Sequence, residues 1–117
     1  MEGHWLRPAS NGVVLIFVHG LLSSSETAWS VGSQTSWPQL VVHDSELASV
    51  GVYTFTYSSH ILSGTYRIGD AVDALKEQLG LGGLYASKTL IFVCHSMGGI
   101  LVRQFIVDRQ LDLSKRG

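Results

Sequence analysis

The sequence has little cysteine, little charge and no excess of charge of either sign. Cys94 is the single cysteine, which excludes an internal disulfide and any site that needs several cysteine ligands. Eight basic and nine acidic residues give a net charge of −1, so the chain lacks the basic surface that nucleic acids or acidic membranes attract. Only 15% of the residues are charged whereas 45% are hydrophobic, which excludes disorder and predicts a well-buried core.

Long uncharged apolar runs and targeting signals are also missing. The most apolar zone, 90–107, contains His95 and Arg103, whereas a membrane span needs about 20 apolar residues with almost no charge. The opening residues contain no apolar segment of a signal peptide. With 117 residues, we expect at most one soluble domain. The compartment stays open, although a single cysteine without a signal favours an intracellular protein.

Short apolar runs alternate with segments of helical period. Three runs are typical of buried strands: 13–18, 50–57 and 89–94. If the segment 67–79 is helical, its apolar residues form a stripe along one face and its charged residues lie on the opposite face, as in an amphipathic helix. Two further helices are expected, near 36–43 and from about 96 to 110. Strands that alternate with helices predict a three-layer α/β/α fold with a parallel sheet.

The segment 89–99 combines a strand, a tight turn and the start of a helix. Its sequence is T-L-I-F-V-C-H-S-M-G-G, with Ser96 directly after the strand. This pattern resembles the nucleophile elbow G-x-S-x-G, in which a serine occupies a strained turn and the residues two positions away must be small. Ser96 is therefore the predicted nucleophile, and an ordinary strand-to-helix turn is the alternative. The residues expected to shape the elbow are Cys94 (where glycine is usual), His95, Gly98 and Gly99.

The first apolar run also ends in a tight turn, V-H-G-L-L. Gly20 permits a sharp bend and a close approach of the backbone to a substrate. The backbone N–H of Leu21, or that of Leu22, can then act with the N–H of Met97 as a pair of oxyanion donors. His19 lies on the strand expected beside the nucleophile strand, and we expect it to shape this turn. Both turns are expected at the carboxyl edge of one sheet.

Together these segments resemble the oxyanion and nucleophile strands of the α/β-hydrolase superfamily. Within this superfamily, the chain resembles lipase-like serine esterases, including relatives of the GPI inositol-deacylases. The resemblance lies in four segments: V-H-G-L, Thr27 with Trp29, the S-W-P segment at 36–38 and C-H-S-M-G-G. The resemblance implies hydrolysis of a carboxylic ester or lipid substrate through an acyl intermediate on Ser96. It implies no metal and no organic cofactor. It covers most of the chain but only the N-terminal half of that fold.

No histidine follows Ser96, although the order in that fold is serine, then Asp or Glu, then histidine. Asp108 and Asp112 follow the serine, but we expect both to be solvated charges on the helix after it. His95 adjoins the serine and leaves the turn in another direction. His60 follows a strand that is two ladder spacings away, roughly 10 Å, whereas a hydrogen bond needs about 3 Å.

We therefore expect residues 1–117 to be the N-terminal portion of a hydrolase domain that stops before its acid and histidine. A serine hydroxyl without a base is a poor nucleophile, so these residues alone should show little esterase activity. The sheet would continue past 89–94, leaving that strand at an exposed edge that a missing half or a complementing chain would cover. The alternative is a non-catalytic module that keeps the fold for recognition or assembly in a larger protein.

A few other residues have mainly structural interpretations. His4 and His43 are expected on the surface, in a leader and a helix respectively. Trp29 and Trp37 could line an acyl pocket, but packing in the core is the more common fate of a tryptophan. The glycines of 80–83 precede a strand instead of following one, which argues against a phosphate-binding loop.

Overall fold

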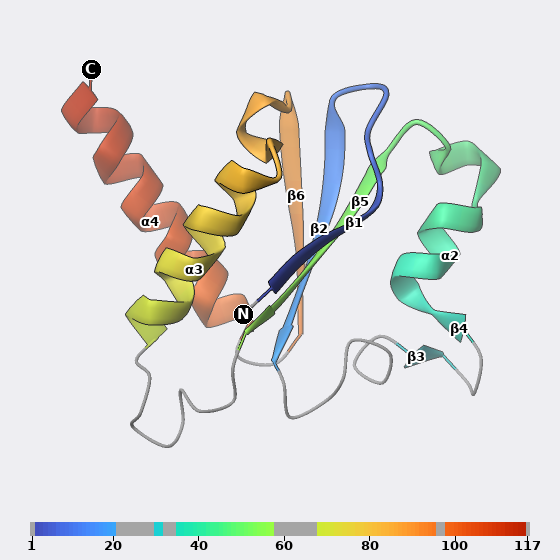
Figure 1. Ribbon diagram of the computed structural model, residues 1–117, viewed down its shortest axis with the longest axis horizontal. Helices are drawn as coiled ribbons and strands as arrows, with labels where there is room; N and C mark the ends of the chain where they lie inside the picture. The colour runs from blue at the N-terminus through green and yellow to red at the C-terminus, as the bar shows by residue number, and fades with distance from the viewer. Residues whose placement is uncertain (1, 21–29, 32–34, 58–67, 96–97, 117) are drawn as a thin grey trace.

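The computed structural model describes residues 2–20, 30–31, 35–57, 68–95 and 98–116, which form a layered α/β arrangement (Figure 1). The expected strands and helices are all present, with ends that differ by a few residues. The elements are β1 (Glu2–Arg7), β2 (Val13–Gly20), β3 (Ser30–Val31), β4 (Thr35–Ser36), α2 (Trp37–His43), η1 (Ser45–Leu47), β5 (Gly51–Tyr57), α3 (Ile68–Leu81), η3 (Leu84–Ala86), β6 (Thr89–Cys94) and α4 (Gly98–Arg116).

Four strands form a mixed sheet in the order β1-β5-β2-β6. β2 pairs in parallel with β5 on one side and with β6 on the other, so the carboxyl ends of all three strands meet at one edge. β1 pairs with β5 in the antiparallel direction. The α/β class is thus confirmed, but the sheet is not wholly parallel, because the segment interpreted as a leader forms its fourth strand.

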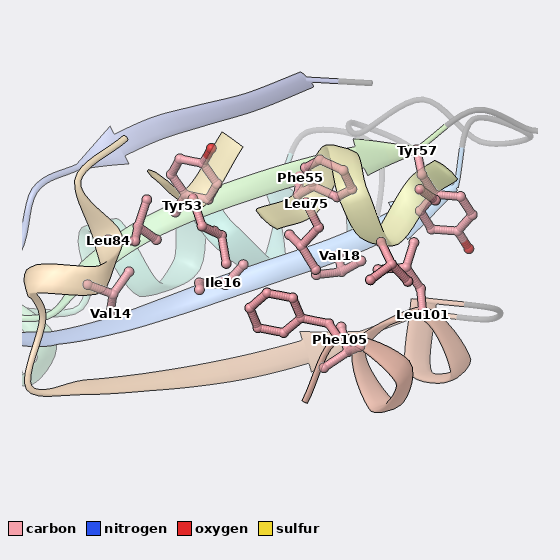
Figure 2. Packing of buried hydrophobic residues seen from close by; sticks show 14 residues of the cluster. Val14, Ile16, Val18, Tyr53, Phe55, Tyr57, Leu75, Leu84, Leu101 and Phe105 are labelled. Atoms are coloured by element: carbon pink, nitrogen blue, oxygen red, sulfur yellow. The ribbon is translucent and has the colours of Figure 1, made fainter. Parts of the chain in front are cut away.

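Helices cover both faces of this sheet. α3 and α4 lie on one face and α2 lies on the other, which confirms the three layers (Figure 1). Successive side chains of β2 point to opposite faces of the sheet, as they do in any β-strand. Val14, Ile16 and Val18 join the larger core under α3 and α4 (Figure 2), whereas Phe17 packs with Val52 on the α2 side.

The amphipathic stripe predicted for α3 is the face that it buries. Its buried residues are Ala71, Val72, Leu75 and Leu79, and Asp73 and Glu77 are exposed. Burying a leucine side chain contributes roughly 1.5–3 kcal/mol, so this face accounts for much of the attachment of α3 to the sheet. Within the part of the chain that is described, no helix is both long and apolar enough to cross a membrane.

β6 lies at the edge of the sheet, as the sequence predicts. No described strand pairs with its outer side, and Ile91 is 44% exposed there. α4, which follows it, also leaves apolar side chains uncovered: Ile100, Ile106, Val107 and Leu111. Among the described residues, the apolar edge strand β6 and the helix that follows it, α4, therefore both leave apolar side chains exposed to solvent.

Arg7 connects the end of β1 to the segment that leads into β5. Its guanidinium donates to the carbonyl oxygens of Val42 (2.8 Å), Leu47 (2.7 Å) and Val50 (2.8 and 3.0 Å). Val42 belongs to the last turn of α2, where a cation complements the exposed carbonyls of the helix. Arg7 thereby holds α2, η1 and the start of β5 together.

Candidate functional site

Three of the predicted site residues, Ser96, Met97 and Leu21, lie outside the described residues. Their flanks are described, because β2 ends at Gly20, β6 ends at Cys94 and α4 begins at Gly98. The geometry of these flanks fixes where the two predicted turns are anchored. It does not place the serine hydroxyl or the two amide donors.

The two turns leave the same edge of the sheet. β2 and β6 are parallel neighbours in a register that pairs Val13 with Thr89 and Val18 with Cys94. Their carboxyl ends therefore lie side by side, and Figure 1 shows both ends at the lower edge of the sheet. A bend at Gly20 on the opposite edge would have excluded a shared site.

The junction between β6 and α4 is bonded to the end of β2. The backbone N–H of His95 donates to the carbonyl oxygen of Val18 at 3.0 Å. The N–H of Gly98 donates in turn to the carbonyl oxygen of His95 at 3.0 Å. His95 thus connects the end of β2 with the first residue of α4 through two backbone hydrogen bonds.

Gly98 packs directly against the backbone of β2. A Cβ at this position would lie 2.8 Å from the carbonyl oxygen of Val18 and 3.3 Å from its Cγ1. Such a contact is well inside van der Waals distance, and the oxygen belongs to a strand that cannot yield easily. At Gly99 the nearest atom would be the Cβ of Cys94 at 4.0 Å, an ordinary contact. The requirement for a very small residue therefore falls on position 98, as an elbow predicts, and not on 99.

Cys94 occupies the position before the turn where an elbow usually has glycine. It is a free and partly exposed cysteine on the edge strand. Burial of its sulfur by neighbouring groups raises the pKa of its thiol, so the thiol stays protonated at neutral pH. A protonated thiol is a weak nucleophile, and Cys94 is therefore a poor substitute for the serine.

His19 is completely buried next to the predicted oxyanion turn. Its Nε2 lies 3.2 Å from Oγ1 of Thr56, the residue that faces it across the β2–β5 pair. This contact occupies one ring nitrogen with a neutral hydroxyl. His19 is thus held as part of the end of β2, which agrees with a role in shaping the turn and leaves that nitrogen unavailable as a catalytic base.

The other described histidines lie on the surface. His4 is exposed on β1, where its Nε2 lies 3.0 Å from a carboxylate oxygen of Glu2, and His43 is exposed on α2. His95 is exposed beside the turn. His60 lies outside the described residues, but β2 does separate β5 from β6, as the two-spacing argument assumes.

Asp108 behaves as a surface charge on α4. Its carboxylate accepts hydrogen bonds from Gln104 at 2.9 Å and from Lys76 at 3.4 Å. The bond from Gln104, together with the hydrogen bond and the charge of Lys76, lowers the pKa of Asp108 below its ordinary value. The side chain of Asp112 is not described.

The core location expected for Trp37 is wrong. The tryptophan begins α2 and is 54% exposed, because this short helix turns Val41 and Val42 toward the sheet instead. Trp29 lies outside the described residues.

Two residues that the sequence did not single out, Thr56 and Tyr57, stand at the carboxyl end of β5 beside the predicted turn. The signal that could have found them is the placement of two polar groups at the end of an otherwise buried strand.

Comparisons with known proteins support the family and nothing finer. A sequence model described as the alpha/beta hydrolase family matches residues 15–114. Comparison with curated proteins and with solved structures gives no match. In the described part of the chain, no three His, Cys, Asp or Glu side chains gather in a way that could hold a metal ion.

Proposed function

Because the chain belongs to the alpha/beta hydrolase family, we propose that it is a serine hydrolase of the esterase or lipase type with Ser96 as its nucleophile. The observation that carries the proposal is the close packing of Gly98 on Val18, together with the bond from His95 to the same carbonyl. This packing supports a strand-to-helix turn at Ser96, because β6 and α4 are both attached to β2 near Gly20, where β2 ends.

In the proposed reaction, Ser96 Oγ attacks the acyl carbon of a carboxylic ester. The carbonyl oxygen becomes an oxyanion, which the backbone N–H groups of Leu21 and Met97 stabilise, and each such donor is typically worth 10²–10³ in kcat. The leaving alcohol departs with a proton, and water then releases the acid from the acyl-serine. Both steps need a base that accepts the proton of the attacking group.

We propose that the acid and the histidine come from outside these residues, either from further chain or from a complementing chain. The family places both after the serine, and the sequence contains no histidine after Ser96. The exposed outer side of β6 is a surface on which such a segment could add a strand. The finer likeness to relatives of the GPI inositol-deacylases depends on sequence motifs alone.

The test is labelling by a fluorophosphonate probe, with and without a high concentration of imidazole as a substitute base. We expect slow labelling that imidazole accelerates and that Ser96→Ala abolishes. Ser87→Ala, which removes a serine just before β6, should change nothing. Labelling that survives Ser96→Ala would contradict the assignment of the nucleophile.

The second candidate is a non-catalytic module with this fold, and the missing histidine is the observation that favours it. Hydrolysis of a 4-nitrophenyl ester by the chain distinguishes the possibilities. Negligible turnover that imidazole restores through Ser96 supports a hydrolase without its base. Turnover that stays absent, with no labelling, favours the module, whereas substantial Ser96-dependent turnover without imidazole refutes the missing-base argument.

A further inference from the structure

Asn11 is the single asparagine of the chain, and glycine follows it. The pair lies in the connection between β1 and β2, where Asn11 is exposed and Gly12 is half-buried. A side-chain amide in this position can be attacked by the backbone nitrogen of the next residue, and a glycine there has no side chain that blocks the approach. The connection therefore contains both reacting groups of a modification that needs no enzyme.

The attacking group is the backbone nitrogen of Gly12. Within the described residues, its N–H donates no hydrogen bond, whereas the N–H groups of Asn11 and Val13 on either side of it both donate one. The φ of Gly12 is +79°, a left-handed conformation that a residue with a side chain rarely adopts. The turn thus keeps a glycine next to the asparagine and leaves the nitrogen of that glycine free to react.

The attacked group is the side-chain amide of Asn11, which the start of β2 holds and polarises. Its Oδ1 accepts the backbone N–H of Val13 at 3.0 Å, as in an Asx turn. When a nucleophile adds to Cγ, negative charge develops on this same oxygen. A backbone N–H that already points at the oxygen stabilises that charge, as the donors of an oxyanion hole do. The bond therefore favours the addition as well as the turn.

We propose that Asn11 is a site of spontaneous deamidation in the folded protein. The nitrogen of Gly12 gives its proton to a base from the solvent and bonds to Cγ of Asn11. The bond from Cγ to Nδ2 then breaks, and Nδ2 takes up a proton and leaves as ammonia. One water molecule opens the resulting five-membered succinimide. Opening at Cγ gives aspartate, whereas opening at the main-chain carbonyl carbon gives isoaspartate, in which the main chain passes through Cβ.

The two products should affect the fold differently. Aspartate keeps the oxygen that accepts the N–H of Val13, so the turn can persist. Isoaspartate lengthens a main chain that is attached on both sides. Before it, the N–H of Ser10 donates to the carbonyl oxygen of Ser49 at 2.9 Å. After it, the carbonyl oxygen of Gly12 accepts the N–H of Thr89, the first residue of β6, at 3.1 Å. Isoaspartate should therefore loosen the attachment of this turn to β6.

The test is incubation of the folded chain in mildly alkaline buffer, followed by peptide mapping with mass spectrometry and an isoaspartate methyltransferase assay. We expect Asn11 to convert to aspartate and isoaspartate at a rate similar to that of the chain unfolded in urea. The exposed Gln39 of α2 should stay unchanged, because a glutamine must close a larger ring. Asn11→Gln should abolish the isoaspartate signal.

The comparison with the unfolded chain decides the proposal. Similar rates exclude a reaction that proceeds only through rare unfolding, and they support deamidation within the folded turn. An Asn11 that stays intact in the folded chain but converts in urea would show that the fold protects it, which overturns the proposal. An isoaspartate signal that survives Asn11→Gln would overturn the assignment to this residue.

Thermal unfolding of the separated products provides the second readout. Both products carry one additional negative charge, so ion exchange separates them from the parent chain. The midpoint of the isoaspartate form should lie below that of the parent, and the midpoint of Asn11→Asp should stay close to it. An isoaspartate form as stable as the parent would contradict the claim that the attached turn cannot absorb the longer main chain.

Discussion

Gly98 and Val18 meet so closely that the helix after the predicted nucleophile rests on the backbone of the neighbouring strand. A Cβ on residue 98 would lie 2.8 Å from the carbonyl oxygen of Val18, and the same oxygen accepts the N–H of His95. One carbonyl thus fixes both sides of the turn that contains Ser96. The described residues before and after Ser96 are thus both attached to β2.

Gly98→Ala should therefore destabilise the fold. The added methyl group must displace the backbone of β2 or α4, and overpacking of this kind costs about 1–3 kcal/mol. The matched control is Gly99→Ala, where the nearest contact is 4.0 Å and removal of a helical glycine stabilises by up to about 1 kcal/mol. Urea unfolding measures both. Equal stability of the two variants would contradict the close packing at position 98.

Thr56→Val should destabilise the fold by about 1–3 kcal/mol. The substitution keeps the shape of the side chain but removes the hydroxyl that lies 3.2 Å from Nε2 of the fully buried His19. Thr56→Ser retains the hydroxyl and should recover most of the loss. Thr54→Val, on the same strand, is the control, because the hydroxyl of Thr54 forms no such bond within the described residues. A loss as large in Thr54→Val would mean that the hydroxyl–imidazole contact is unimportant.

Gln104→Ala should raise the pKa of Asp108 toward its ordinary value. The bond from Gln104 is the largest single cause of the lowered pKa of Asp108, and Lys76 lowers it through both a hydrogen bond and its charge. Because the folded pKa is lowered, the stability that Asp108 contributes is present above its unfolded pKa and is lost as the pH falls through the folded one. An NMR titration of the carboxyl carbon measures the shift. Lys76→Met should also raise the pKa of Asp108, and an unchanged pKa in either variant would contradict the cause assigned to that residue.

The sequence predicted much of the arrangement because buried parallel strands are nearly continuous apolar runs. The runs at 13–18 and 89–94 place β2 and β6, and their polar ends mark the shared edge. The alternation in 67–79 likewise places α3. The need for a small residue at position 98 could be stated in advance, since it follows from the turn geometry.

Other features depend on contacts that no local pattern reveals. β1 has a weak apolar pattern and is held by its pairing with β5, by the bond from Trp5 Nε1 to the carbonyl oxygen of Gly82, and by the edge-on contact of Trp5 with Tyr53 at 5.3 Å. The exposure of Trp37 follows from which side of a two-turn helix meets the sheet. The contact between His19 and Thr56 requires the β2–β5 register, which the sequence does not specify.

The exposed edge of β6 leads to the last prediction, that Ile91→Lys reduces self-association of the isolated chain. β6 contains no charged residue and no proline, the features by which edge strands usually avoid pairing with other chains. A lysine at the 44% exposed Ile91 should interrupt such pairing while changing the free energy of unfolding by no more than about 0.5 kcal/mol. Leu81→Lys is the matched control, because Leu81 is 74% exposed but belongs to the end of α3 and not to a strand. Light scattering over a range of protein concentrations measures the association. If both lysine variants reduce it equally, general hydrophobicity is the cause, and the open edge of β6 is not the surface that a completing segment would use.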